Sequence, residues 1–415
     1  MTINKAAQSI AGPSSVPSPP SPPPPPFDEH NHLLIDFDDG HNDPPPEFAP
    51  YHAEYFDTGN GNIVSHDPHL NTDGEALYRF LLSQASTPPS LSLHCRGTHT
   101  ETRQRHVTKA GPGGGSSTQS YTETVVDFDF YISLDQLILP EPTHWSVADS
   151  DPAYRGRMFK EMDLSGKRKA RWKERRAFRS WIKDRDARGL PPWISSIQAT
   201  DTYPTLEDST VLRSSKTLRA WADEYCASPK YLKEFVYVKS VYGWNLRNLE
   251  SAIRSIIKSS LYTGDLEVNF ESSGKVYIRP DNRLSRTLSN KWLKFLSIIL
   301  FIFPFIWLFK RFHSKGGGRW EVCGGAYALK RWQPLDSEPE HPLDAKGPVA
   351  RDAVIVRSRD GQAKKLVGSR EGEWLKQWQG TIMRAVQMRY ESTEPMLVTT
   401  EQILNHPLPI GLDGY

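Results

Sequence analysis

The sequence predicts an α+β protein of mixed antiparallel strands and helices, interrupted by one transmembrane or re-entrant helix and preceded by a disordered N-terminal arm. Three observations support this. Residues 1–75 are rich in proline and acidic side chains. Residues 76–391 mix strand-like and helix-like patterns without the strict alternation of a parallel α/β protein. Residues 295–309 contain no charge and are bracketed by lysine and arginine.

The N-terminal arm, residues 1–75, has twelve acidic residues against the single basic residue Lys5, so it cannot bury enough apolar surface to fold. A run of prolines that begins at Pro19 and ends at Pro26 favours polyproline II. Such a run can dock into polyproline-binding domains of SH3, WW or EVH1 type, or serve as a solvated spacer. An apolar island at residues 33–37 has the composition of a partner-binding motif.

The first folded elements are two strands. Residues 91–102 and 126–134 alternate between apolar and polar side chains, and a glycine-rich break at 111–117 separates them. We expect a long-looped antiparallel pair. The alternation directs Asp127 and Asp129 to the solvent, which argues against acid–base chemistry by this carboxylate pair.

Residues 167–188 read as a basic helix with eleven basic residues, ended by Gly189. An apolar arc that includes Phe178 and Trp181 could insert at a membrane interface while the cations meet anionic lipid. The same face suits nucleic acid, a calmodulin-like groove, or simple packing on its own domain. The candidate lipid-binding residues are Lys167, Arg168, Lys169, Arg171, Lys173, Arg175, Arg176, Arg179 and Trp181.

The next stretch predicts a core. A helix at 217–227 is followed by a strand at 235–242 and by a helix capped by Asn245 that carries a single apolar stripe. Residues 266–270 and 276–278 then flank a Ser-Ser-Gly turn and predict a tight hairpin.

After the apolar segment, residues 320–330 predict a strand, 353–356 and 363–367 a hairpin, and 371–389 an amphipathic helix. Strands from both sides of the apolar segment can share one sheet only if both lie on the same side of a membrane.

The apolar segment is the strongest functional signal. Residues 292–309 measure roughly 27 Å as a helix, close to the thinner bilayer of the endoplasmic reticulum. Pro304 kinks it, so a re-entrant or in-plane insertion stays open beside a crossing, as does a buried core helix. Six basic residues on each side leave the orientation undecided but favour two cytosolic flanks. The predicted membrane residues are Trp292, Phe295, Ile299, Phe303, Pro304, Trp307 and Phe309.

These signals divide the chain into seven segments: the arm 1–75, a strand-rich hairpin region 76–145, a basic helix and linker 146–215, an α+β region 216–290, the membrane segment 291–312, a C-terminal α+β region 313–391 and a tail 392–415.

Four stretches carry a family resemblance: RPDNRLSR at 279–286, NKWLKFLSIILFIFPFIWLFKRF at 290–312, GGGRWEVCGGAYALKRW at 316–332 and EGEWLKQW at 371–378. Together they resemble a family of uncharacterised fungal single-span membrane proteins of unknown function, over about residues 76–391. The resemblance implies a fungal origin and one membrane segment, and it assigns no activity and no functional residue.

No pattern asks for a cofactor, a metal or a catalytic residue. The glycine run 111–115 lacks the Gly-Lys-Ser/Thr of a phosphate loop. His94 and His99 would point to opposite faces of a strand, and no zinc-type spacing accompanies them. Three distant cysteines form no disulfide framework.

We therefore expect a membrane-anchored, non-enzymatic protein that recruits cytosolic partners to an endomembrane surface, such as the endoplasmic reticulum. The N-terminal region should be cytosolic, because it has no signal-peptide pattern. The alternatives are a membrane-bound enzyme whose site is scattered in sequence, and nucleic-acid binding through residues 167–188.

Overall fold

The computed structural model describes residues 52–59, 61–108, 116–164, 166–194, 214–334, 355–357 and 363–399, and it has the predicted mixed α+β class. Ordered structure begins before the predicted boundary at residue 76, because strands and a 3-10 helix already occupy 56–71. The proline run and the apolar island of the arm lie outside the described residues.

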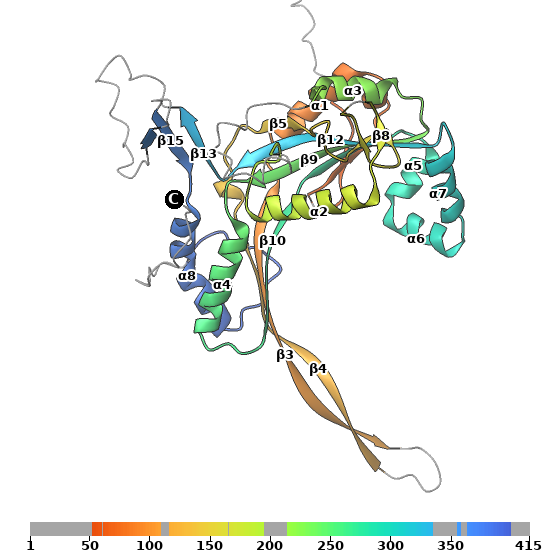
Figure 1. Ribbon diagram of the computed structural model, residues 1–415. Coiled ribbons are helices and arrows are strands. Elements are labelled where there is room, and N and C mark those ends of the chain that lie inside the picture. Colours follow the sequence, from red (N-terminus) through yellow and green to blue (C-terminus); the bar gives the residue numbers. More distant parts are fainter. Residues whose placement is uncertain are drawn as a thin grey trace, which may run out of the picture. The chain divides into compact units, whose positions relative to one another are not determined.

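A seven-stranded sheet forms the centre of this unit (Figure 1). Its order is β1-β2-β11-β9-β12-β5, with β6 also pairing with β12. The strands are β1 Phe56–Asp57, β2 Ile63–Ser65, β5 Thr143–Ser146, β6 Tyr154–Arg157, β9 Leu232–Tyr242, β11 Lys275–Ile278 and β12 Gly317–Ala328. β9 runs parallel to β12 and antiparallel to β11. The strands predicted at 235–242 and 320–330 are thereby confirmed. Both lie in the middle of the sheet.

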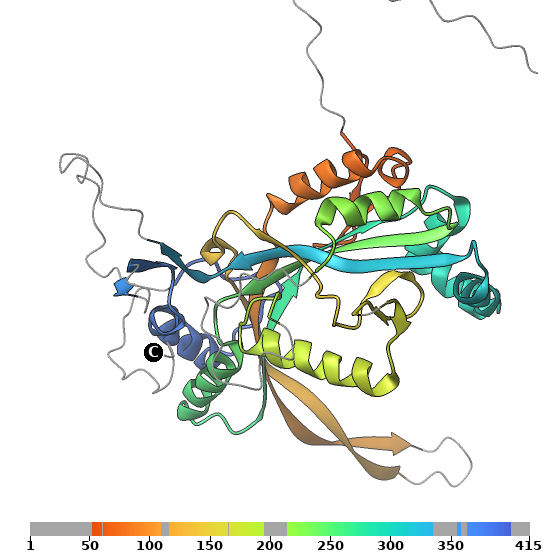
Figure 2. The ribbon, with the colours of Figure 1, turned by 45° about the horizontal axis from the view of Figure 1, so that its top comes forward.

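Helices α1 Gly74–Ala85 and α3 Leu218–Ala227 cover one face of this sheet (Figure 2). Asp73 and Thr217 cap them by accepting hydrogen bonds from backbone N–H groups of the first turn. Their apolar sides, including Trp221 and Tyr225, are fully buried against Phe235 and other strand residues. The helix predicted at 217–227 is confirmed.

The second sheet has the order β10-β3-β4, with β3 Ser90–Thr108, β4 Ser116–Ser133 and β10 Asp265–Ser273. Helices α4 Leu246–Ser259 and α8 Glu371–Gln387 pack their apolar stripes on it. Asn245 caps α4 as predicted, by accepting from the Asn248 N–H at 3.1 Å. The antiparallel pair and both helices are confirmed. β3 and β4 continue beyond β10 as a two-stranded ribbon (Figure 1).

The hairpin predicted at 266–278 is wrong. β10 pairs with β3 over nine residues, whereas β11 pairs with β9 and β2. Gly274, with a φ of +152°, lies where the chain passes from one sheet to the other. β10 and β11 each pair with a longer strand from elsewhere in the sequence, namely β3 and β9. The Ser-Ser-Gly turn between β10 and β11 therefore sets only the change of chain direction.

The exposure predicted for Asp127 is also wrong, because the side chain is buried. The register shifts by one residue between Gly97 and Thr98, so that Asp127 is the extra residue of a β-bulge. Its carboxylate lies 2.9 Å from His99 Nδ1 and accepts a hydrogen bond from the Tyr262 hydroxyl, also at 2.9 Å.

The remaining elements lie outside these two sheets and the helices that pack on them. They are η1 His69–Asn71, η2 Asp135–Leu137, β7 Glu161–Met162, β8 Arg168–Lys169, α2 Trp172–Ala187, α5 Arg283–Ser289, α6 Lys291–Ile299, α7 Phe303–Phe312, β13 Lys330–Pro334, β14 Ile355–Arg357 and β15 Ala363–Gly368. β14 pairs antiparallel with β15, which confirms the hairpin predicted there, although its turn lies outside the described residues.

Replacing His99 by Gln should lower stability in a pH-dependent way. The hydrogen bonds that His99 donates to the carboxylates of Asp127 and Glu101 raise its pKa. A raised pKa stabilises the fold below the ordinary histidine value, and this contribution disappears as the pH rises through the raised pKa. The urea midpoint of His99→Gln should therefore lie below wild type in mildly acidic buffer and approach it in alkaline buffer.

Tyr262→Phe is the matched control, because it removes the other donor to Asp127 without removing a group that titrates near neutral pH. Its cost should stay constant between the two buffers. An equal cost of His99→Gln at both pH values would contradict this assignment.

Candidate membrane-docking site

The predicted membrane segment is two helices and not one. α6 and α7 are bent by 103° at a three-residue break. Phe301 occupies this break with a left-handed φ of +54°, and Pro304 lies at the start of α7, where its missing N–H costs little. The predicted kink at Pro304 is therefore wrong, since the chain turns earlier. Among the described residues no single helix is long and apolar enough to span a membrane, although α6 and α7 together pass that test.

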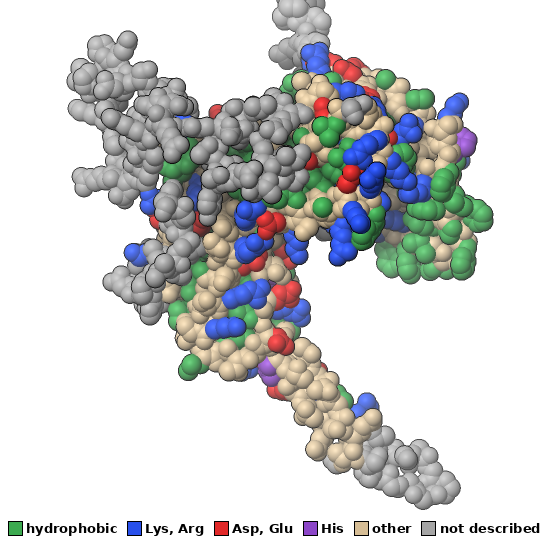
Figure 3. All heavy atoms as spheres, in the orientation of Figure 1, with side chains coloured by type: hydrophobic (Ala, Val, Ile, Leu, Met, Phe, Trp, Pro, Cys, Tyr) green, Lys and Arg blue, Asp and Glu red, His purple; other side chains and the backbone are tan. Residues whose placement is uncertain are grey.

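We call residues 291–312 the apolar lobe. Its large side chains are exposed, with Trp292 at 79%, Phe301 at 77% and Phe305 at 72%, and α7 has no buried residue. Figure 3 shows them as one contiguous apolar surface at α6 and α7. The alternative of a buried core helix is excluded. Of the predicted membrane residues, five are exposed and two are half-buried: Trp292, Phe295, Ile299, Pro304 and Trp307, then Phe303 and Phe309.

Both ends of the lobe return to the same sheet. β11 ends at Ile278 and β12 begins at Gly317, and each lies beside β9. Because β11 is antiparallel and β12 parallel to β9, the chain leaves and re-enters at the same end of β9. The backbone N–H of Leu232 donates to Gly316 at 2.8 Å and closes this end. A single membrane crossing between β11 and β12 is incompatible with this pairing.

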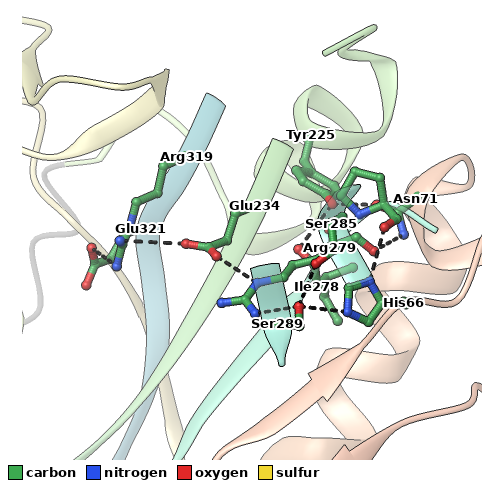
Figure 4. A network of polar contacts seen from close by, with 11 residues as sticks. His66, Asn71, Tyr225, Glu234, Ile278, Arg279, Ser285, Ser289, Arg319 and Glu321 are labelled. Atoms are coloured by element: carbon green, nitrogen blue, oxygen red, sulfur yellow. Dashed lines mark hydrogen bonds and ion pairs between the residues drawn. The ribbon is translucent and has the colours of Figure 1, made fainter. Parts of the chain in front are cut away.

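A network of polar contacts surrounds the segment that leads from β11 into the apolar lobe (Figure 4). Arg279, directly after β11, donates from Nε to Glu234 at 2.8 Å and from Nη1 to Ser289 Oγ at 2.9 Å. His66 Nε2 lies 2.9 Å from the same hydroxyl. Asn71 donates to the Arg279 carbonyl at 2.9 Å. These contacts fix α5, which leads directly into α6, against the sheet.

The return strand joins the same network. Arg319 on β12 lies 3.6 Å from Glu234 through Nη1 and 3.0 Å from Glu321 through Nη2. Burial opposes ionisation of Glu234, but Arg279, Lys310 and Arg319 outweigh it and lower the pKa of this carboxyl. Glu234 is thus a charged bridge between the strands on either side of the lobe.

The basic region differs from its prediction at the N-terminal end. α2 begins at Trp172, so Lys167, Arg168, Lys169 and Arg171 precede the helix. β8 pairs with β7, and the Ala170 N–H donates to the Lys160 carbonyl, which holds this stretch extended. The Glu174 carboxylate accepts from the Arg171 N–H at 2.7 Å and from Arg168 Nη2 at 2.8 Å, which starts the helix at residue 172.

The apolar arc of α2 faces the protein. Phe178 is buried and Trp181 is half-buried beneath the Arg188 guanidinium, so neither forms the predicted inserting surface. Trp172, at 61% exposure, is the aromatic side chain that α2 presents outward. Figure 3 shows lysine and arginine side chains gathered beside the apolar lobe. Seven of the predicted basic residues are exposed: Lys167, Arg168, Lys169, Arg171, Lys173, Arg176 and Arg179. Arg175 is half-buried.

No protein-family model, curated protein or solved structure matches this chain. The fungal family resemblance therefore stays a prediction. Among the described residues no group of His, Cys, Asp and Glu side chains is placed to hold a metal ion. The three cysteines, Cys95, Cys226 and Cys323, are free.

Sequence patterns gave no indication of the network that supports the lobe. Glu234 precedes the predicted strand by one residue, and a single carboxylate there looks like an ordinary solvent-facing charge. Arg279 follows a short apolar pair, and Ser289 has no special neighbour. The one available signal was the set of basic residues that flank the lobe, because several cations close together suggest a buried carboxylate that pairs with them.

Replacing Glu234 by Gln should destabilise the protein, because it leaves Arg279 without its carboxylate and Arg319 with Glu321 alone. We expect a cost of about 2 kcal/mol, in the range for a charged hydrogen bond that is not fully buried. The lowered pKa of Glu234 means that this contribution is present above the ordinary glutamate value and is lost as the pH falls through the lowered pKa. Urea unfolding across that acidic range measures both effects.

Glu373→Gln is the control, because Glu373 is exposed and lies 3.7 Å from Arg370. It should change stability little. A Glu234→Gln protein as stable as wild type at neutral pH would rule out the bridging role.

Proposed function

We propose that this chain is a membrane-anchored, non-enzymatic protein that docks on one face of an endomembrane and recruits cytosolic partners there. The observation that carries the proposal is the exposed apolar lobe whose two ends return to one sheet. Soluble monomers rarely expose a contiguous apolar patch of this kind without a partner or a membrane to cover it.

A bilayer fits the lobe better than a protein groove does. Lys291 and Lys294 lie on the first turn of α6, and Lys310 and Arg311 on the last turn of α7. Long basic side chains at the two ends can reach headgroups while the apolar faces enter the acyl region. Trp292 and Trp307 supply the amphipathic rings that favour the interface.

The dimensions favour insertion into one leaflet. α6 has nine residues and α7 has ten, so each helix measures about 15 Å at 1.5 Å per residue. That is about half of a typical hydrocarbon core. The return of both ends to the sheet supports a re-entrant or in-plane arrangement, with the folded body on one side.

The basic residues of β8 and α2 favour docking on the cytosolic face of the membrane, where anionic lipids are found. Exposed cations near a surface each favour binding to anionic lipid by about 1 kcal/mol. The recruitment part of the proposal rests on the sequence of the acidic, proline-rich arm.

Replacing Phe301 and Phe305 together by Asp should detach the protein from neutral vesicles. Each phenylalanine contributes roughly 1.5–3 kcal/mol when buried in an apolar phase, so partition should fall at least about tenfold. Flotation of the purified chain with phosphatidylcholine vesicles measures the effect.

The matched control is Leu261→Asp with Val398→Asp. Leu261 is 88% exposed with a φ of +64°, which closely resembles Phe301, and Val398 is 78% exposed. This control should float as wild type does. If wild type stays at the bottom of the gradient, or if both double variants float equally well, the docking role fails. Retention on RNA or DNA in place of vesicles would instead favour the nucleic-acid alternative.

Tags at the two termini test the arrangement in the membrane. Because β9 and β12 fix both ends of the lobe to one folded body, protease added to sealed microsomes should remove both tags. Protection of one tag alone would mean that the chain crosses the bilayer.

A further inference from the structure

A row of cations leads away from the apolar lobe along the sheet face opposite α1 and α3. Lys310 of α7 interacts electrostatically with Arg279 and Arg319, and Arg319 does so with Lys160. Two arginines of α2, Arg175 and Arg179, lie close enough to Lys160 to lower its pKa. Two carboxylates, Glu234 and Glu321, lie among these six cations. Within the row itself the cations therefore outnumber the carboxylates.

The row ends at a cavity between the sheet and α2. It has a volume of about 530 Å³. Its lining includes Tyr154, Lys160, Phe178, Ile182 and Glu321, and three further carboxylates, Asp151, Asp186 and Glu250, also line it. Lys160 Nζ lies 5.6 Å from the centroids of both the Tyr154 and Phe178 rings. The Arg319 guanidinium carbon lies 5.2 Å from the Tyr154 ring. Lys160 therefore marks the end of the cavity nearest the row, and Arg319 approaches the same Tyr154 ring from outside the cavity lining.

Several donors at this end lack an acceptor. The Nε atoms of Arg175 and Arg319 are buried and have no hydrogen-bond partner. The Lys160 ammonium forms no ion pair with a described carboxylate, and it is half-buried. Burial lowers the pKa of Lys160, which is the usual effect on an ammonium short of counter-charge. Buried donors without acceptors cost free energy, and an incoming anion would remove that cost.

We propose that Lys160, Arg175 and Arg319 bind the phosphate of an anionic phospholipid. This site rests on the proposed docking function, because the lobe places the row of cations at headgroup level. Arginine and lysine are the side chains that recognise phosphate oxygens, and Arg175 and Arg319 offer the unpaired donors. The aromatic walls suit the glycerol and upper acyl region better than a fully polar solute.

A headgroup with an exposed phosphate monoester should bind most tightly, because it offers more acceptor oxygens than a phosphodiester. The experiment compares phosphatidylcholine vesicles that contain either phosphatidic acid or phosphatidylserine, at contents that give equal surface potential. Wild type should prefer phosphatidic acid. The variant Lys160→Gln with Arg175→Gln should lose this preference, with binding to phosphatidic acid vesicles at least about tenfold weaker.

Two further variants separate the site from its surroundings. Lys258→Gln with Lys376→Gln removes the same charge from exposed positions on α4 and α8, and it should keep the preference. Lys160→Arg with Arg175→Lys keeps the charge and should restore binding in part, which guards against loss through misfolding.

The outcomes distinguish the two proposals. No binding of wild type to any vesicle overturns the docking function and this site with it. Binding to neutral vesicles with an unchanged lipid preference in Lys160→Gln with Arg175→Gln overturns the headgroup site alone. Displacement from phosphatidic acid vesicles by an equal concentration of free glycerol phosphate would overturn the lipid as its source.

Discussion

The pairing of β9 with β12 is the constraint on which the rest of the structure depends. It joins strands on either side of the apolar lobe into one sheet, in parallel, through ten residue pairs with one register shift between Trp320 and Cys323. Parallel neighbours need a long crossover connection, and here that connection includes the α5–α7 excursion. The positions of β11 and β12 in the sheet therefore fix both ends of the apolar lobe, and the bend between α6 and α7 lets the chain return to the sheet. Glu234 strengthens the same junction, because its carboxylate meets arginines that follow β11 and begin β12.

Local periodicity predicted the elements that bury one face against a core. The alternation from Phe128 to Leu134 and the stripe of α4 from Leu249 to Ile257 were recovered, because each such pattern depends only on its own neighbours. The partners of the strands were not predictable in this way. β10 and β11 carried the pattern of a hairpin, yet each had a longer partner far away in sequence. Asp127 was misassigned because a one-residue bulge reverses the side of the sheet that a side chain faces.

The candidate site was predicted in part. The uncharged run and its basic flanks located the apolar lobe, since these are properties of composition. The position of the bend was not readable, because nothing marks a phenylalanine such as Phe301 for a left-handed conformation, which favours glycine or asparagine. The basic stretch at residues 167–188 was recognised, but its first residues form β8, which β7 holds extended. A helical wheel considers only neighbours along the chain, so it could not predict this pairing.

The apolar lobe lies between β11 and β12, so it is separate in sequence from the strands that form the sheet. The two strands flank β9, so their facing ends are only about two strand spacings, roughly 10 Å, apart. A linker of a few residues covers that distance. Under the proposed docking function, lipid binding and folding are therefore encoded by separate stretches of chain. A shortened chain in which such a linker replaces the apolar lobe should keep the sheet and lose its affinity for vesicles.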